Sequence, residues 1–194
     1  MATEIINERL LYPHYEIIRG AKVRFPSADL THCDIVGRIM FSIGKHLIEN
    51  KRGYLYSNVY VRFDDENIFV PDFSVVLKEH EQLLANRRYI FGVPDMVVEV
   101  LSYSTRKNDL TVKKDTYEAQ GVREYWIVNP WDKSVMVYLL RDGKYFLDDV
   151  YILLDEKNLA LLDDEERATV KNAIPVSIVD GLSIPLEFVF SWGY

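Results

Sequence analysis

The stretch from Val93 to Pro130, "VPDMVVEVLSYSTRKNDLTVKKDTYEAQGVREYWIVNP", decides the fold. It begins with a nearly continuous aliphatic run, residues 95–101, of the kind found in strands buried on both faces of a sheet. A helical segment follows, in which Asp109 is a good N-cap and Gly121 a good C-cap. The run "EYWIVNP" then predicts another strand. A buried strand, a crossover helix and a further strand together predict a sheet covered by helices.

The segments before this stretch predict a hairpin and a long helix. Residues 14–25, "HYEIIRGAKVRF", have the pattern of a short hairpin with Gly20 at its turn. The helix that follows can be capped by Ser27 or Asp29, and Gly53 is expected to end it. Its apolar positions repeat at steps of three and four residues: Val36, Ile39, Met40, Ile43 and Leu47.

Further strands are predicted on both sides of the central stretch. Residues 54–63 and 67–77 flank the polar turn "DDE", so we expect these two strands to pair. The polar run "KEHEQLLANRR" after them is compatible with a helix. Downstream, the pattern predicts a hairpin about "NPWDK", a strand "KYFLDDVYILL" and an acidic helical stretch "DEKNLALLDDEERATVKN".

This order of elements predicts an α/β or α+β fold with a mixed β-sheet flanked by helices. With 194 residues, of which 48% are hydrophobic and 27% charged, the chain fits one globular domain over residues 1–194. No linker, internal repeat or low-complexity segment divides it.

Composition excludes several classes of function. The formal net charge of -7 argues against a protein that coats nucleic acid non-specifically, although it does not exclude a nuclease. The single cysteine, Cys33, cannot form an internal disulfide, and we expect it to pack within the first helix. No Cys/His cluster has zinc spacing. The apolar runs are too short to span a membrane and the N-terminus does not have a signal-peptide pattern, so the expected location is cytoplasmic.

Glu99 is a carboxylate in the middle of a strand that is otherwise apolar. Alternation places it on one face with Asp95 and Val97, and burying it without a partner would cost several kcal/mol. A metal ion, an arginine or a lysine would supply the missing charge. Asp72 raises the same demand on the neighbouring apolar run.

Two carboxylates on adjacent strands can converge on one Mg²⁺ ion, which takes one or two carboxylates and keeps waters for a phosphate substrate. Lys113 is the third element, because it lies about one turn into the helix that follows the Glu99 strand. A structural alternative remains open, in which both acids form salt bridges to basic residues of the chain: Arg106, Lys113 or Arg123. Lys114 is the rival of Lys113 for the catalytic role.

A Pro-Asp on one strand, followed on the next by an acid and a lysine two residues apart, is the signature of the PD-(D/E)XK nuclease superfamily. Here Leu101 stands where that lysine is expected. The segments "VPDFSVV", "VPDMVVEVLSYST" and "NDLTVKKDTYEAQGVREYWIVNP" resemble the Uma-type restriction-endonuclease family, in which the lysine is displaced onto the next helix. In this sequence that lysine corresponds to Lys113, four residues before Tyr117.

The resemblance covers residues from about Tyr15 to Phe190, with two departures. The family usually has proline at the position of Tyr103, and commonly an acid at the position of Ala21. The second departure leaves open whether a further acid supports the site. The acidic stretch from Asp155 to Glu166 resembles an insertion.

The resemblance implies a restriction-endonuclease-like fold and a metal-dependent endonuclease acting on DNA. Asp72, Glu99 and the main-chain carbonyl of Val100 would hold Mg²⁺, with Mn²⁺ as an alternative, and Lys113 would assist. Endonucleases that cut both strands often work as homodimers, so the hairpin around Trp126 and Trp131 is either an interface or core.

Three residues are minor candidates: Asp95, His32 and Tyr117. Asp95 shares the face of Glu99, although an acid at a strand start also caps or solvates the strand end. His32 lies early on the first long helix, where the family often has histidine. A second function class stays open, namely a non-catalytic protein of nuclease fold that binds nucleic acid or a protein partner.

Overall fold

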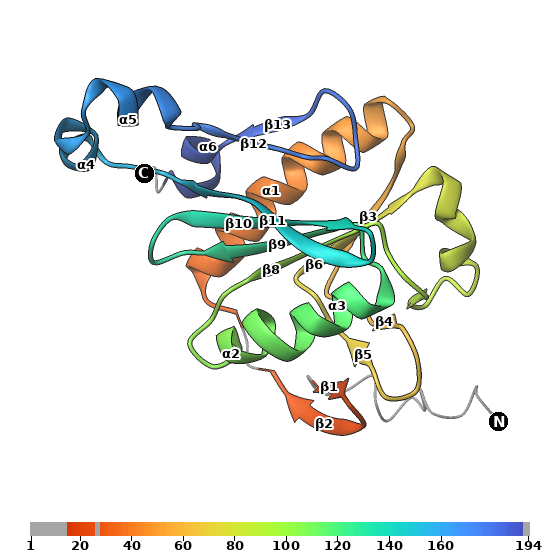
Figure 1. The fold of residues 1–194 in the computed structure, drawn as a ribbon. Helices are drawn as coiled ribbons and strands as arrows, with labels where there is room; N and C mark the ends of the chain where they lie inside the picture. Colours follow the sequence, from red (N-terminus) through yellow and green to blue (C-terminus); the bar gives the residue numbers. More distant parts are fainter. Residues whose placement is uncertain (1–14, 26–27, 192–194) are drawn as a thin grey trace.

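The computed structural model of the chain describes residues 15–25 and 28–191 (Figure 1). It has the mixed α+β architecture that the sequence predicts, with helices flanking β-sheets. Two details of that prediction lie outside the described residues: His14 at the start of the first hairpin and Ser27 as a helix cap. The other candidate cap, Asp29, accepts a hydrogen bond from the backbone N–H of His32 and caps α1.

The central sheet has six strands in the order β11-β10-β9-β8-β6-β3. Its strands are β3 (Gly53–Ser57), β6 (Phe73–Leu77), β8 (Met96–Val100), β9 (Glu124–Asn129), β10 (Ser134–Arg141) and β11 (Lys144–Ile152). Only β8 and β9 run parallel within it, and a parallel pair needs a crossover. The crossover is the helical segment α2 (Arg106–Asn108), η2 (Asp109–Lys113) and α3 (Lys114–Gln120).

A second sheet has five short strands in the order β2-β1-β5-β4-β7. Its strands are β1 (Tyr15–Ile18), β2 (Ala21–Arg24), β4 (Val61–Arg62), β5 (Ile68–Phe69) and β7 (Ile90–Phe91). The predicted pairing of residues 54–63 with 67–77 is therefore confirmed, although it is shared between the two sheets. Pro71 lies at the break between β5 and β6, where its missing N–H interrupts no ladder, and Asp72 comes directly after it.

Helices cover both faces of the six-stranded sheet (Figure 1). On one face, α1 (Leu30–Glu49) and α6 (Leu186–Phe190) pack on the side chains of Met96, Val98 and Val100. On the other face, α3 packs its Tyr117 against Val97 and Leu101. The alternation predicted for residues 95–101 is thereby confirmed.

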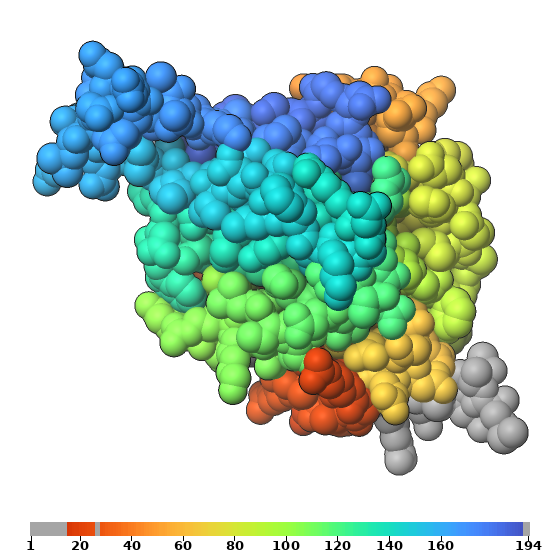
Figure 2. Space-filling view, viewed as in Figure 1, coloured from red at the N-terminus to blue at the C-terminus, as the bar shows by residue number. Residues whose placement is uncertain are grey.

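The remaining elements lie outside the two larger sheets, although some of them contribute buried side chains to the core. They are η1 (Lys78–Leu84), α4 (Glu156–Leu161), α5 (Asp164–Thr169), β12 (Ala173–Pro175) and β13 (Ser183–Pro185). The acidic stretch that contains α4 and α5 is helical, as predicted, and projects from the body of the molecule as an arm (Figure 2). Within the described ranges, no helix is both long and apolar enough to cross a lipid bilayer.

Three local predictions were wrong. Asp109 is not an N-cap, because the helical segment already begins at Arg106 and Asp109 has helical dihedral angles within it. Cys33 is exposed, since the buried stripe of α1 begins only at Ile35. The helix α1 ends at Glu49, whereas Gly53 starts β3 and is needed there because a Cβ would lie 2.6 Å from the Val76 carbonyl oxygen.

Candidate active site

A cleft of about 610 Å³ opens between α1, the end of β8 and the crossover helix. Most of the predicted site residues line it: Asp72, Glu99, Val100, Lys113 and His32. Tyr117 lies beneath the cleft as a fully buried side chain. The sixth side-chain candidate, Asp95, is not among the lining residues.

Strand register brings Asp72 beside Glu99. In the antiparallel pair of β6 and β8, Phe73 is opposite Val98, so one further step along the ladder places Asp72 opposite Glu99. A hydrogen bond fixes this arrangement, because the backbone N–H of Val100 donates to Asp72 Oδ2 at 2.6 Å. Two acids far apart in the sequence therefore share one end of the sheet.

Lys113 reaches back from the crossover helix to the strand that precedes it. Its Nζ lies 2.6 Å from Glu99 Oε1, and the hydroxyl of Tyr117 donates to the same oxygen at 2.7 Å. Because Lys113 and Tyr117 are four residues apart, they share one face of the helix. Lys114 instead lies over the ring of Tyr138, with its Nζ 5.2 Å from the ring centre.

Two buried acids of the site were missed from the sequence. Glu16 on β1 has its Oε1 2.9 Å from Lys113 Nζ, and the same oxygen accepts the backbone N–H of Val70 at 2.7 Å. Asp109 has its Oδ1 3.4 Å from Lys113 Nζ, one helical turn away. A signal for Glu16 existed, because alternation places it on the same face as Ile18, which is buried.

The acids of this cluster outnumber its cations. Burial lowers the pKa of Lys113, but the carboxylates of Glu16 and Glu99 outweigh that effect and hold its pKa well above the ordinary value. The pKa of Glu99 is raised well above its ordinary value, mainly by burial, although the charge of Lys113 opposes the rise. The neighbouring carboxylates, Asp109 among them, raise it further. A bound proton or an added cation would relieve this excess of negative charge.

His32 connects two of the predicted metal ligands. Its Nε2 lies 3.1 Å from Asp72 Oδ2 and also 3.1 Å from the carbonyl oxygen of Val100. Burial lowers the pKa of His32, whereas the hydrogen bond to Asp72 and its charge raise it, with a net rise. His32 therefore orients the Asp72 carboxylate at the mouth of the cleft.

The chemistry of these groups fits a hard divalent cation. Mg²⁺ prefers oxygen ligands. The cleft offers three groups with such oxygens, namely the carboxylates of Asp72 and Glu99 and the main-chain carbonyl of Val100. Asp109 Oδ1 is buried without a hydrogen bond and shares the Lys113 ammonium, 3.4 Å away, with Glu16 and Glu99, which adds to the demand for positive charge.

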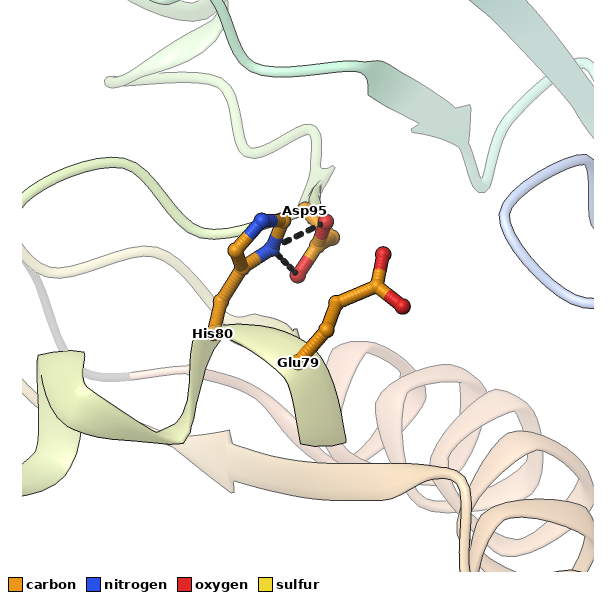
Figure 3. Close-up of side chains that lie close together, drawn as sticks. All are labelled: Glu79, His80 and Asp95. Carbon is orange, nitrogen blue, oxygen red and sulfur yellow. Dashed lines mark hydrogen bonds and ion pairs between the residues drawn. The ribbon is translucent and has the colours of Figure 1, made fainter.

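Asp95 belongs to a separate cluster with Glu79 and His80 (Figure 3). Among the residues that the structure describes, this is the one group of three His, Cys, Asp or Glu side chains whose ligand atoms all lie within 4.8 Å, so it could hold a metal ion. The Asp95 carboxylate already accepts from Leu77 N–H at 2.8 Å, His80 Nδ1 at 2.9 Å and Arg123 Nη1 at 3.1 Å. The negative charge of the Asp95 carboxylate is therefore stabilised by groups of the protein itself.

The fold and the acid–lysine cluster together define a protein of the restriction-endonuclease-like class. The model of the Uma2 family, described as "Putative restriction endonuclease", matches residues 8–177, and the chain belongs to this family. A crystal structure of "a putative nuclease belonging to DUF820" from Anabaena variabilis ATCC 29413 is 20% identical, with a TM-score of 0.72 over 96% of this chain and 97% of that chain. That likeness shows a shared fold. A search of curated proteins found no match.

Proposed function

We propose that this protein is a Mg²⁺-dependent endonuclease that hydrolyses phosphodiester bonds in DNA. Its family and fold support a nuclease function. The observation that best supports the finer proposal is the Lys113 ammonium, which lies 2.6 Å from Glu99 in the cleft that Asp72 also lines. Two carboxylates can hold a metal ion that polarises a phosphodiester, and a lysine can stabilise the charge that develops on its oxygens.

In this proposal, Asp72, Glu99 and the carbonyl of Val100 hold the ion, with Mn²⁺ as an alternative to Mg²⁺. When bound, the ion supplies Lewis-acid chemistry, which polarises the phosphate and lowers the pKa of a water molecule. The Val100 N–H bond and His32 hold Asp72 in place, so little reorganisation is required when a substrate binds.

Lys113 is the proposed electrostatic catalyst. Its pKa is held well above the ordinary value, so the side chain stays charged at neutral pH. That charge orients an attacking water or stabilises negative charge on the phosphate oxygens in the transition state. Tyr117 and Glu16 are positioning residues, because one hydrogen-bonds Glu99 and the other pairs with the ammonium of Lys113.

The test is cleavage of four substrates: supercoiled plasmid, linear duplex DNA, single-stranded DNA and RNA. We expect cutting of DNA with Mg²⁺ or Mn²⁺ and none with a chelator. Asp72→Asn and Lys113→Gln should abolish it, whereas Lys114→Gln is a matched control that should cut at the wild-type rate. Cutting that persists in Asp72→Asn contradicts the mechanism. If no substrate is cut, the alternative of a non-catalytic binding module is favoured.

Metal binding has a separate readout in thermal stability. A ligand that binds only the folded state stabilises it by an amount that grows with concentration, so Mg²⁺ or Mn²⁺ should raise the melting temperature. Glu99→Gln should abolish this rise, whereas Asp95→Asn should leave it intact. If Asp95→Asn is the variant that abolishes the rise, the metal binds at the Glu79, His80 and Asp95 cluster instead.

Three further proposals concern the setting of the protein. We propose that residues 1–194 form a single domain, that it acts in the cytoplasm, and that it cuts both strands as a homodimer. Light scattering on the purified protein tests the dimer. The fully buried Trp126 belongs to the core, so of the two tryptophans of the β9–β10 hairpin only Trp131 is exposed enough to contribute to an interface.

A further inference from the structure

Two exposed aromatic side chains meet at the rim of the cleft. Tyr103, in the loop between β8 and α2, is 73% exposed, and Trp131, in the turn between β9 and β10, is 42% exposed. Their ring centres lie 4.4 Å apart at an interplanar angle of 38°. Both residues line the same cleft as Asp72 and Glu99. Adjacent exposed rings at the rim of a cleft present apolar faces that a ligand can cover, which is a feature of binding surfaces.

Hydrogen bonds within the two loops fix the backbone that carries these rings. In the Tyr103 loop, the Ser102 hydroxyl lies 2.8 Å from the Thr105 hydroxyl oxygen and accepts the Thr105 N–H at 3.2 Å. In the Trp131 turn, the side-chain oxygen of Asn129 accepts the N–H of Trp131 at 3.0 Å. The aromatic pair is therefore preorganised, which reduces the entropy cost of binding a flat ligand.

Positive charge lies beside the aromatic pair. The guanidinium of Arg106 is 5.5 Å from the centre of the Tyr103 ring, and both Arg106 and the next residue, Lys107, are exposed. The cleft thus has acids at its base and two aromatic rings at its rim, with Arg106 beside one of them. Aromatic rings beside basic side chains are the arrangement that binds single-stranded nucleic acid, in which the rings stack on bases and the cations contact phosphates.

We propose that Tyr103 and Trp131 form a stacking platform for an unpaired nucleobase of the nucleic-acid substrate, with Arg106 contacting the adjacent phosphate. This inference rests on the proposed function and deepens it by naming the substrate class. Bases inside an intact duplex are stacked on each other, so their faces are not accessible to a side chain. The enzyme therefore prefers DNA with an unpaired base near the scissile bond, such as single strands, frayed ends or mismatches, and cuts both strands of a fully paired duplex more slowly.

The experiment measures binding separately from cutting. All proteins carry Glu99→Gln, and fluorescence anisotropy gives the Kd of a labelled single-stranded 12-mer, the matching duplex, and a 12-mer whose sugars carry no bases. The single strand should bind more tightly than the duplex. Tyr103→Ala and Trp131→Ala should each weaken single-strand binding by roughly 5- to 150-fold, because stacking contributes about 1–3 kcal/mol per base. Neither variant should change binding of the strand without bases.

Two controls separate stacking from a structural role. Tyr103→Phe keeps the ring and should keep the affinity of the parent protein. Phe146→Ala removes an exposed ring on β11 that also lies beside an arginine, Arg141, but does not line the cleft, and it should leave binding unchanged. Circular dichroism melts verify that each variant is folded at the assay temperature.

The outcomes distinguish this inference from the proposed function. Binding that depends on the two rings supports the platform even if the wild-type protein cuts no substrate. Cutting by the wild-type protein without any effect of the two alanine variants on binding overturns the platform and leaves the nuclease proposal standing. Equal losses for the strands with and without bases, tighter binding of the duplex, or no binding of single strands each overturn the platform as well.

Discussion

The two ends of strand β8 carry acids in opposite electrostatic settings. Asp95 precedes the strand and Glu99 lies near its end; both are buried. Asp95 accepts from His80 and Arg123, and Glu79 also approaches Arg123, so two carboxylates share two potentially cationic partners. Among the side chains that the structure describes, Glu99 has a single cationic partner, Lys113, which two further acids also approach.

This difference separates a structural acid from a functional one. A buried carboxylate whose charge is already matched by cationic side chains of the protein needs no bound cation. A group of carboxylates that exceeds its cations is destabilising by itself, and such a cost is typical of sites that bind a cation or perform chemistry. Asp72 and Asp95 each end a Val-Pro-Asp sequence, yet only Asp72 lies at the end of the sheet that carries Glu99.

The largest predicted effect concerns Lys113. Lys113→Ala leaves Glu16 and Glu99 buried without their cation, so the free energy of unfolding at pH 7.5 should fall by about 3–5 kcal/mol. Urea denaturation measures this. Lys114→Ala, the matched control, should change it by less than about 0.5 kcal/mol. Equal effects of the two substitutions would contradict the assignment of the buried charge to Lys113.

The next largest predicted effect is the difference in DNA-cutting rate between substitutions of Glu99 and of Asp95. Glu99→Gln should lower the rate of DNA cutting by roughly 10²–10³-fold, because it removes one of the two carboxylates proposed to hold the metal ion. Asp95→Asn, compared at equal folded fraction, should cut at nearly the wild-type rate. A plasmid-nicking time course measures both. A larger loss of cutting rate in Asp95→Asn than in Glu99→Gln would mean that Asp95 is the functional acid and Glu99 the structural one.

A third buried acid, Glu124 on β9, predicts a pH effect. Its carboxylate accepts from neutral donors, Trp126 Nε1 at 2.7 Å and Ile178 N–H at 2.9 Å. Burial raises its pKa to about 7, against the opposing effect of these hydrogen bonds. The folded state therefore holds a proton that the unfolded state releases near pH 4.5, so stability is lost as the pH rises from about 4.5 to about 7.

Glu124→Gln isolates this contribution. Between pH 5 and pH 8, the free energy of unfolding of the wild-type protein should fall by about 2–3 kcal/mol more than that of Glu124→Gln. Urea denaturation across the pH range measures the difference. Parallel curves for the two proteins would show that Glu124 titrates at its ordinary pKa.

The smallest predicted effect concerns folding stability, which the two substitutions Asp95→Asn and Glu99→Gln should change in different directions. Asp95→Asn removes charge-assisted hydrogen bonds from His80 and Arg123 and should destabilise the fold by about 1–2 kcal/mol. Glu99→Gln removes one of several crowded carboxylates, so stability at pH 8 should be unchanged or raised. Thermal melts of the two variants provide the comparison. A fall of equal size in both would mean that Glu99 is held by ordinary ion pairs.

The sequence by itself determined the class of fold and much of the candidate cleft. The apolar run from residue 95 to 101 indicated a strand buried on both faces. Alternation placed Glu99 on one face of this strand and Met96 and Val98 on the other, because successive side chains of a strand point to opposite faces. Helical spacing placed Lys113 and Tyr117 on one face. These inferences succeeded because they depend on local periodicity, which needs no knowledge of distant segments.

Only the tertiary structure decided which charges meet. Glu16 enters the site because β1 pairs with β5, and Asp95 leaves it because η1 brings His80 to the start of β8. Asp109 became a buried acid instead of a cap, since the helix begins one turn earlier than its local pattern indicates. Electrostatic interactions depend on distance in space and on burial, and neither is encoded in the spacing of residues along a single strand or helix.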